Sequence, residues 1–531
     1  MKRIDEVLIV GGGTAGWLTA AYLARRLGSN RPDGVKITLI ESSEIGIIGV
    51  GEGTIPTIQT TLRTIGLDEA QFMKGADASF KQGVKFVDWA HAPDAGHKRW
   101  YYHSFSRPHE LPGGFDLAPY WLMGVTGDVS FSEAVTLQDR VCEAGRGPKL
   151  IEDPQFYSPL SYAYHFDAGK LAAYLKQVGI ELGVRHLVGN VESVELDGDG
   201  AIASVKTREH GVLKAGLYID CTGFAAALIE KAMGVPFVSD ADTLFVDRAL
   251  AIQVPYETPD APVHCTTLST GHEAGWTWDI GLPDRRGVGY VYSSAHTDDS
   301  RAEEVLRRYI GKPAEGLDAR MLKLRIGHRA KAWVKNCVAI GLSAGFLEPL
   351  ESTGIMMIEG AAWMLGRLFP RDGNLEATAK LFNHAMAERF AGALDFLKLH
   401  YCLSRRPEAF WQDNTQASGI PDSLKAKLEM WRVRPPDPFD FSTVHDSFES
   451  FNYQYVLFGM GFRPDIEANR AAYPYVEQAK REFQRIREAS GRAAAGLPDH
   501  RALLKTIYSQ GFRSEPPTAR LGVAPIRAAA G

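Results

Sequence analysis

The first forty residues carry the pattern that most restricts how this chain can fold. Residues 7–10 are an apolar run typical of a short strand, and residues 11–16 follow with glycine at the first, third and sixth positions. A helical segment begins at Trp17, and a second apolar run, 36–40, ends at Glu41. These glycines allow a tight turn and close approach of a pyrophosphate to a helix N-terminus, while the acid can accept hydrogen bonds from a ribose. The pattern predicts a dinucleotide-binding α/β fold and does not separate FAD from NAD.

A second informative segment is Glu-Pro-Leu-Glu-Ser-Thr-Gly at residues 348–354. It follows an apolar run, 337–341, that is typical of a buried strand, and it precedes a helical run that continues through Leu365. The Ser-Thr-Gly therefore lies at a helix start, where unpaired N–H groups and the helix dipole favour an anion. A helix cap is the ordinary explanation for such residues. The acidic Glu351 beside an anion site indicates chemistry instead.

Composition excludes several classes of function. The chain has 531 residues and a net charge of −5 without a polybasic stripe, so nucleic acid is not an expected partner. Its five cysteines form neither a metal-like pair nor a disulfide framework, which predicts no metal site and a reducing, cytoplasmic setting. We find no signal-peptide pattern and no uncharged apolar run of about 18 residues, so no membrane association is expected.

Three further motifs make the chain resemble the flavin-dependent tryptophan halogenase family. They are Gly-Val-Gly-Glu-Gly-Thr-Ile-Pro at 49–56, Phe-Lys-Gln-Gly at 80–83 and Trp-Thr-Trp-Asp-Ile at 276–280. Together with residues 11–17 and 348–354, the resemblance covers almost the whole chain. It implies an α/β (α+β overall) protein with an FAD-binding, Rossmann-like fold of the flavin monooxygenase type. An inserted β-rich substrate region and a mostly helical C-terminal part complete the expected architecture.

The expected domain organisation is discontinuous. We assign FAD binding to residues 1–85, 160–235 and 325–375, and an inserted substrate and flavin-shielding region to 86–159 and 236–324. Residues 376–513 form a helical, substrate-side region, and the Pro- and Ala-rich residues 514–531 form a loose tail.

The resemblance also implies a reaction. FADH2 and O2 would oxidise chloride or bromide to hypohalous acid, with the halide held at the amides of Thr353 and Gly354. Lys81 would deliver the oxidant to an indole or tryptophan-like ring, and Glu351 would polarise it or take the ring proton. Burial favours a neutral lysine amine, which a haloamine requires. No second NADPH-binding motif is visible, so a separate flavin reductase is the expected source of FADH2.

The cofactor contacts implied by the matched motifs are spread along the chain. They are Gly11, Gly13, Thr14, Ala15, Gly16, Glu41, Gly49, Val50, Val191, Leu342 and Ile355. Trp276 and Trp278 would shield the flavin from organic substrate. The sequence departs from the family here, because Gly281 stands where a proline is expected and Pro283 follows two residues later. This departure leaves the geometry of the loop open.

The substrate side is less completely matched. His103 and Phe105 correspond to the family residues that flank the indole ring, an arrangement consistent with aromatic stacking. The family's lid, with its Tyr-Tyr, Glu and Phe-Trp elements, is not found in residues 412–450, and the Phe-Trp pair at 410–411 belongs to a different helical context. We therefore expect an open site that accepts indole compounds at least as readily as free tryptophan, with attack at C3 of indole. Bromide is expected to work at least as well as chloride.

Two other classes are compatible with a flavin-binding chain. A flavin-dependent aromatic monooxygenase that hydroxylates its substrate would not need Lys81, the paired tryptophans or a halide loop. A catalytically silent flavoprotein would not need to retain Lys81 and Glu351. The halogenase interpretation explains all of these features, with a homodimer as one option for the assembly.

Overall fold

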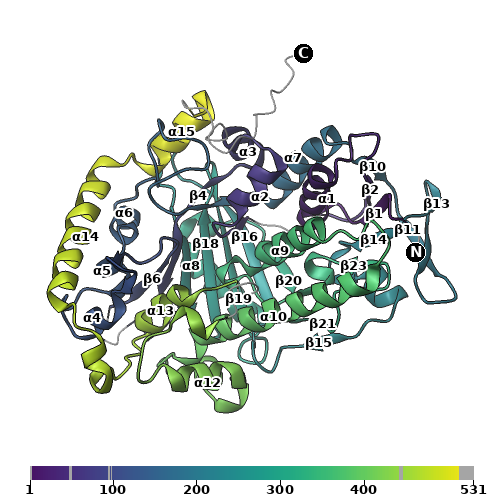
Figure 1. The fold of residues 1–531 in the computed structure, drawn as a ribbon. Coiled ribbons are helices and arrows are strands. Elements are labelled where there is room, and N and C mark those ends of the chain that lie inside the picture. The colour runs from purple at the N-terminus through teal and green to yellow at the C-terminus, as the bar shows by residue number, and fades with distance from the viewer. Residues whose placement is uncertain (1–2, 47–50, 94–95, 97, 442–446, 513–531) are drawn as a thin grey trace.

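The structure of the protein, a computed structural model, describes residues 3–46, 51–93, 96, 98–441 and 447–512. Figure 1 shows a sheet near the N-terminus on the right, a second large sheet in the middle, and the C-terminal helices around the left and lower sides. Strands and helices alternate along the first part of the chain, while helices dominate the last part. The predicted mixed α/β architecture is confirmed.

The N-terminal sheet is mainly parallel and follows the order β10-β2-β1-β14-β23-β22. Its β22 runs antiparallel to β23, and the other neighbours run parallel. The carboxyl ends of parallel strands meet at one edge, which brings Val10, Glu41 and Cys221 together. The strands are β1 (Glu6–Val10), β2 (Lys36–Glu41), β10 (Arg185–Val188), β14 (Leu217–Asp220), β22 (Trp333–Val334) and β23 (Cys337–Ala339). The helices α1 (Thr14–Leu27), α7 (Ala168–Glu181) and α9 (Thr353–Arg367) pack beside this sheet, with α1 in contact with both others.

The second sheet has the order β20-β16-β19-β18-β17-β5-β6. Its strands pair antiparallel except where β17 runs parallel to β5. The bounds are β5 (Gly83–Val87), β6 (Trp100–Ser104), β16 (Arg248–Pro255), β17 (Thr267–His272), β18 (Gly275–Gly281), β19 (Arg285–Tyr292) and β20 (Arg320–Lys323). The helix α8 (Asp299–Ile310) packs on β16 and β19 and encloses a small apolar core of its own.

A small three-stranded sheet joins the two large ones. It consists of β3 (Glu52–Gly53), β9 (Ala163–Phe166) and β4 (Ser79–Lys81). Lys81 ends β4, and the chain bends at Gly83 to begin β5 of the second sheet. Gly83 has a φ of +153°, and a Cβ there would lie 2.5 Å from the carbonyl oxygen of His103. The bend therefore requires glycine, and it fixes Lys81 at the junction of the sheets.

The remaining elements are smaller. A hairpin consists of β11 (Val191–Leu196) and β12 (Ile202–Thr207), with β13 (Gly211–Leu213) added at its edge. The residues between 86 and 159 include the short helices α4 (Ala118–Leu122), α5 (Phe131–Val135) and α6 (Gln138–Glu143). The smaller strands are β7 (Glu110–Leu111), β8 (Phe115–Asp116), β15 (Phe237–Ser239), β21 (Gly327–Arg329) and β24 (Gly345–Phe346).

Helices account for most of the chain after residue 375. They are α10 (Leu375–Cys402), α11 (Ala409–Asn414), α12 (Asp422–Met430), α13 (Ser450–Gly459), α14 (Val476–Gly496) and α15 (His500–Gln510). Figure 1 shows α14 running along α5 and α6, so the end of the chain covers the inserted region. Among the helices in the described ranges, none has the length and apolar character that crossing a membrane requires.

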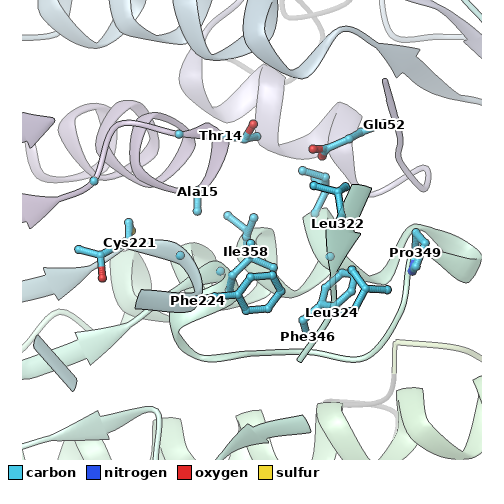
Figure 2. A pocket seen from close by; sticks show the side chains of 18 of the residues that line it. Thr14, Ala15, Glu52, Cys221, Phe224, Leu322, Leu324, Phe346, Pro349 and Ile358 are labelled. Carbon is cyan, nitrogen blue, oxygen red and sulfur yellow. The ribbon is translucent and has the colours of Figure 1, made fainter. Parts of the chain in front are cut away.

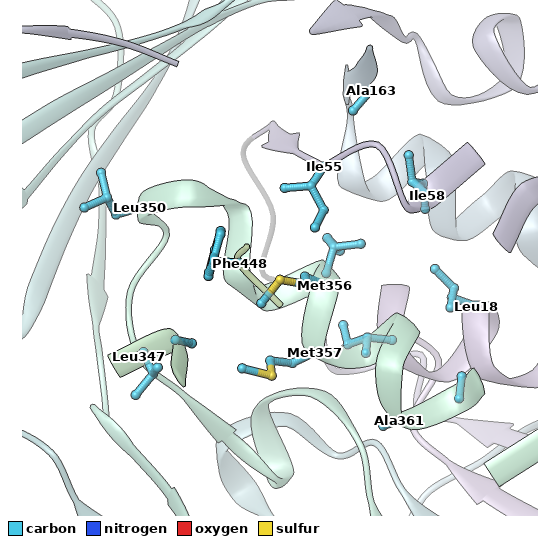
Figure 3. Close-up of a cluster of buried hydrophobic side chains, with 14 of the residues drawn as sticks. Leu18, Ile55, Ile58, Ala163, Leu347, Leu350, Met356, Met357, Ala361 and Phe448 are labelled. Atoms are coloured by element: carbon cyan, nitrogen blue, oxygen red, sulfur yellow. The ribbon is translucent and has the colours of Figure 1, made fainter. Parts of the chain in front are cut away.

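The start of α9 is held by apolar packing. Met356 and Met357 are buried and belong to the apolar cluster that Figure 3 shows, and α9 also contacts α2 (Ile58–Ile65). Full burial of one such side chain contributes about 1.5–3 kcal/mol to the stability of the folded state. This packing fixes the helix N-terminus that the sequence predicted as an anion site.

Asp220, at the end of β14, secures the turn that follows the strand. Its side chain is fully buried and accepts hydrogen bonds from Thr222 and from the backbone N–H groups of Leu228 and Ile229, at 2.7–3.0 Å. Removing this acceptor would leave several buried donors unpaired, which costs about 1–3 kcal/mol for a single group.

We predict that Asp220→Ala lowers the free energy of unfolding by about 2 kcal/mol or more, because its donors lose their only described acceptor. Urea titration followed by tryptophan fluorescence measures the change. Asp197→Ala is the matched control, since Asp197 accepts two backbone hydrogen bonds in an exposed hairpin turn. Equal losses in the two variants would contradict the assigned role of Asp220.

Candidate active site

A cavity of about 520 Å³ opens at the carboxyl edge of the parallel sheet. Its lining includes the turn after β1, the end of β2, the segment after β14 and the start of α9. Figure 2 shows Thr14 and Ala15 on one side, with Phe346 and Pro349 across from them and Glu52 above. The cavity therefore joins the glycine-rich turn to residues 349–355.

The glycine-rich turn packs tightly against the protein backbone on one side and borders the free space of the cavity on the other. Gly11 has a φ of +112°, and a Cβ there would lie 2.2 Å from the carbonyl oxygen of Cys221. A Cβ at Gly16 would lie 1.9 Å from the carbonyl oxygen of Gly11. A Cβ at Gly13 would meet no described atom within 4 Å, so space remains in front of the N-terminus of α1. This arrangement fits the pyrophosphate of a dinucleotide.

Glu41 reaches the cavity with its carboxylate held by three donors. Oε1 accepts from Lys176 Nζ at 2.9 Å and from His186 Nε2 at 2.8 Å, and Oε2 lies 3.2 Å from Trp17 Nε1. These contacts orient the carboxylate. Its contact with a ribose stays a prediction.

Most of the predicted cofactor residues line this cavity. Gly16 lies beneath the turn, against Gly11 and Leu39. Gly49 and Val50 lie outside the described residues. The predicted residues in the lining are Gly11, Gly13, Thr14, Ala15, Glu41, Val191, Leu342 and Ile355.

Lys81 lines the same cavity from the end of β4. Its side chain is 1% exposed, and Nζ donates to Ser352 Oγ at 2.7 Å. Nζ also lies 5.3 Å from the centre of the Phe105 ring. Burial lowers the pKa of Lys81 to about 8, against the opposing attraction of Glu351. The sequence predicted Lys81 but not its contact with Ser352.

Glu351 precedes Ser352, the hydrogen-bond partner of Lys81. Both residues have an unusual backbone conformation. Glu351 and Ser352 have φ values of +60° and +59°, and such left-handed residues cost about 1–2 kcal/mol each when they are not glycine. Oε1 accepts from His103 Nδ1 at 2.8 Å and from His400 Nε2 at 3.2 Å. Burial opposes ionisation, but His103 and His400 outweigh it and hold the pKa of Glu351 well below its usual range. Oε2 has no hydrogen-bond partner among the described residues.

His103 and Phe105 meet this group from β6 and the segment after it. His103 Nε2 contacts the side-chain amide of Asn452 at 2.9 Å, and its ring packs against Phe396 and Tyr455. The described lining of the cavity does not include His103 or Phe105. Both side chains are buried, and their contact with a substrate ring stays a prediction.

Two functional neighbours were missed because they are distant in sequence. His400 contacts Glu351 from the last turn of α10, and Asn452 contacts His103 from α13. An isolated histidine in an apolar helical segment gives no signal that separates a packing role from a catalytic one. Only the tertiary structure brings these residues to the carboxylate.

The paired tryptophans lie on β18 and line the cavity. Trp276 Nε1 lies 3.3 Å from Glu348 Oε2, and Tyr401 donates its hydroxyl to the same oxygen at 2.7 Å. Burial raises the pKa of Glu348 to about 7. Glu348 therefore ties the tryptophan pair to the segment that carries Glu351.

The structure explains the glycine at position 281. Gly281 ends β18, and a Cβ there would lie 2.8 Å from the backbone nitrogen of His264. The carbonyl of Gly281 accepts a hydrogen bond from Ser79 on β4, two residues before Lys81. A larger residue would therefore disturb the strand that positions Lys81.

The predicted halide residues begin α9. Thr353 is the first residue of the helix, and its hydroxyl donates to the carbonyl of Glu348 at 2.9 Å. Gly354 lines the cavity, and a Cβ there would have Phe346 as its nearest neighbour at 4.0 Å. The helix start thus faces open space, while a halide contact stays a prediction. Within the described ranges, no cluster of three or more His, Cys, Asp or Glu could hold a metal.

The fold and the cavity together define a dinucleotide-binding type of protein, with a buried lysine and glutamate at one part of the cavity. The chain belongs to the tryptophan halogenase family, because the profile of that family, described as tryptophan halogenase, matches residues 6–474. The chain is therefore a member of the flavin-dependent halogenases, the class of enzyme that the sequence resemblance predicted.

Three relatives illustrate the similarity. The 7-chloro-L-tryptophan 6-halogenase KtzR of Kutzneria sp. (strain 744) is 36% identical, over 93% of this chain and 98% of KtzR. The structure of a tryptophan halogenase from Shewanella frigidimarina is 40% identical with a TM-score of 0.92, over 96% of this chain and 99% of that one. Tar14, a tryptophan C-6 flavin-dependent chlorinase from taromycin biosynthesis, is 37% identical with a TM-score of 0.88, over 95% and 100% of the two chains.

We predict that Gly13→Val lowers the affinity for FAD at least about tenfold, which is about 1.4 kcal/mol. Gly13 has φ −73° and ψ −172°, an extended conformation that valine adopts without strain, so the side chain fills the cavity and leaves the fold intact. Titration of flavin absorbance measures the affinity. Gly198→Val, in a hairpin turn where a Cβ meets no described atom, should bind FAD normally. An FAD affinity equal to that of the unchanged protein would contradict the placement of the pyrophosphate at this turn.

Proposed function

We propose that this protein is an FADH2- and O2-dependent halogenase. It oxidises chloride or bromide to hypohalous acid and delivers the halogen through Lys81 to an indole or tryptophan-like substrate. The observation that carries this function is the placement of Lys81 and Glu351, both buried, in the lining of the cavity that begins at the glycine-rich turn. The proposed dinucleotide site and the lysine–glutamate pair would thereby share one cavity.

The cavity fits FAD on two observations: the open space at Gly13 and the oriented carboxylate of Glu41. The turn would hold the pyrophosphate, Glu41 the ribose, and Val191 and Leu342 would add apolar contacts. Bound as FADH2, the cofactor would supply two electrons to O2, and the halide would supply two more as it is oxidised to hypohalous acid, with the second oxygen atom leaving as water. We infer that a separate flavin reductase supplies FADH2, because the sequence shows a single glycine-rich dinucleotide motif.

The halide would lie at the N-terminus of α9. The amides of Thr353 and Gly354 belong to the first helical turn, where N–H groups and the helix dipole favour an anion. The neighbouring carboxylate of Glu351 would repel a halide if it were uncompensated. Its contacts with His103 and His400 offset that repulsion.

Lys81 is suited to hold the oxidant after it forms. Burial excludes water and favours the neutral amine, whose nitrogen can bind the halogen with release of water or can hydrogen-bond hypohalous acid. Ser352 fixes the position of Nζ at 2.7 Å. The lysine thereby confines a reagent that would attack other side chains.

Glu351 is suited to complete the substitution of the ring. When the carbon–halogen bond forms, Oε2 of Glu351 can take the displaced ring proton, and the C–H electron pair restores aromaticity. Oε2 is the oxygen that has no described partner, whereas Oε1 is occupied by the two histidines. One oxygen would thus react while the other stays anchored.

Trp276 and Trp278 would separate the two halves of the reaction. Both rings line the cavity, with centroids 6.5 Å apart. Two large rings at this position would keep an organic substrate from the flavin, which favours halogenation over hydroxylation. Glu348 fixes the first ring through its contact with the indole N–H.

We predict that Lys81→Ala lowers formation of the halogenated product at least about 100-fold, because the amine that handles the oxidant is lost. FAD binding and the rate of flavin reoxidation should stay unchanged. Mass spectrometry for the halogen isotope pattern measures the product, with a flavin reductase, FAD, NADH and bromide present. Lys85→Ala is the matched control, since Lys85 lies on β5 and pairs with Glu143 at the end of α6.

Each alternative result has a definite meaning. Undiminished product in Lys81→Ala would show that the lysine takes no part in the reaction. Loss of FAD binding in this variant would show that its role is structural. A hydroxylated product from the unchanged enzyme, without halogen, would instead support the monooxygenase alternative.

We predict that indole is halogenated at least as fast as free tryptophan, at C3, and that bromide works at least as well as chloride. Apart from the carboxylate of Glu351, the side chains described in contact with His103 are those of Phe396, Tyr455 and Asn452, which suit a ring more than a charged amino-acid backbone. Competition between indole and tryptophan, read by chromatography and mass spectrometry, measures the preference. A clear preference for tryptophan with one benzo-ring product would show that residues 412–450 form a functional lid.

A further inference from the structure

His400 is placed so that both nitrogens of its ring face hydrogen-bond acceptors. The side chain is fully buried; Nδ1 lies 2.8 Å from the carbonyl oxygen of Phe396, and Nε2 lies 3.2 Å from Oε1 of Glu351. A neutral imidazole has one N–H group and can satisfy only one of these acceptors. Either the ring is doubly protonated, or Glu351 carries the second proton.

His103, the other histidine on Glu351, is different. Its Nδ1 faces Oε1 of Glu351, but its Nε2 faces the amide nitrogen of Asn452. The orientation of that amide is set by its oxygen, which accepts the backbone N–H of Glu449 at 2.7 Å. The amide nitrogen can only donate, so Nε2 of His103 accepts and its ring is neutral. His103 gives Glu351 a hydrogen bond but no positive charge.

The shared proton of the Glu351–His400 pair therefore belongs on His400. Oε1 of Glu351 accepts the N–H of His103 at 2.8 Å, and a hydrogen bond donated to a carboxyl group favours its ionised form. A buried carboxylate without a compensating cation costs several kcal/mol. The pair is accordingly an imidazolium and a carboxylate, both buried.

Other titratable groups face the pair from the elements packed around it. Tyr101 on β6 stays a neutral phenol, because burial raises its pKa well above the usual value. Burial raises the pKa of Glu348 to about 7, and burial holds the pKa of His165, which faces Lys81 from β9, well below its usual range. Of the described groups named here, Lys81 is the remaining one that could supply a positive charge to Glu351.

We propose that His400 is a positioning residue that carries the positive charge balancing Glu351, so that Lys81 can remain an uncharged amine. Without the imidazolium, the attraction of the carboxylate would favour an ammonium at Lys81, which cannot bind the halogen. This inference rests on the proposed roles of Lys81 and Glu351. It gives a chemical reason for a buried histidine in the last turn of α10.

The charge of His400 can be measured without flavin or substrate. Long-range proton–nitrogen correlation spectra of protein labelled with ¹⁵N-histidine distinguish imidazolium from neutral rings, and His400→Gln assigns the signal. At pH 8 we expect both nitrogens of His400 to be protonated. His500 is the neutral reference in the same spectrum, since its ring faces the carbonyl of Val263 and the backbone N–H of Phe80. A neutral His400 would overturn the inference.

The effect on Lys81 can be read from the pH dependence of halogenation. In His400→Gln an amide N–H can still reach Glu351, but the positive charge is gone. Loss of that charge raises the pKa of Lys81, so less neutral amine is present at a given pH. The acid-side midpoint of the rate profile should therefore rise by about one pH unit, with the rate recovering at higher pH.

His384→Gln is the control, because His384 lies on the same helix with an exposed side chain. It should leave the profile unchanged. A uniform loss of rate in His400→Gln, with the midpoint unmoved, would assign His400 a purely structural role and overturn the proposal. Absence of halogenation by the unchanged enzyme would contradict the proposed function instead, and the spectra would still decide the charge of His400.

Discussion

The buried carboxylate of Glu351 is the feature on which the arrangement of the site depends. A charge without water must be met by donors, and this carboxylate meets two histidines from different parts of the chain. The left-handed backbone at Glu351 and Ser352 costs free energy, and strain of this kind persists only where surrounding contacts fix it. Those contacts include the bond from Lys81 to Ser352 and the apolar packing of α9.

The same segment connects the two sides of the proposed reaction. Glu348 precedes Glu351 by three residues and accepts from Trp276 on β18. Thr353 follows and donates back to the carbonyl of Glu348. Because these short-range contacts tie the segment to β18 and to α9, the tryptophan pair, the lysine partner and the carboxylate keep fixed relative positions. Such fixed geometry is what a confined oxidant requires.

Local patterns were enough to predict the nucleotide-binding half of the fold. The strand, turn and helix at residues 6–27 follow from apolar runs and glycine positions, and the structure shows β1 and α1 there. Helix α7 begins at Ala168, because Phe166 still pairs in β9 and Asp167 caps the helix. His400 and Asn452 could not be predicted, because their roles arise from contacts 49 and 349 residues apart in sequence. The reason for Gly281 likewise lies in a neighbouring segment, at His264.

The sequence separation of the Lys81–Ser352 contact bears on how the protein is made. The two partners are 271 residues apart, and Asn452 is 349 residues from His103. During synthesis, the glycine-rich turn and Lys81 leave the ribosome long before the segments that contribute Glu351, His400 and Asn452. A growing chain therefore lacks the parts that would hold and direct an oxidant until most of its length has been translated. In the proposed reaction, the ability to handle hypohalous acid would thus be acquired only once the structure that contains it has been completed.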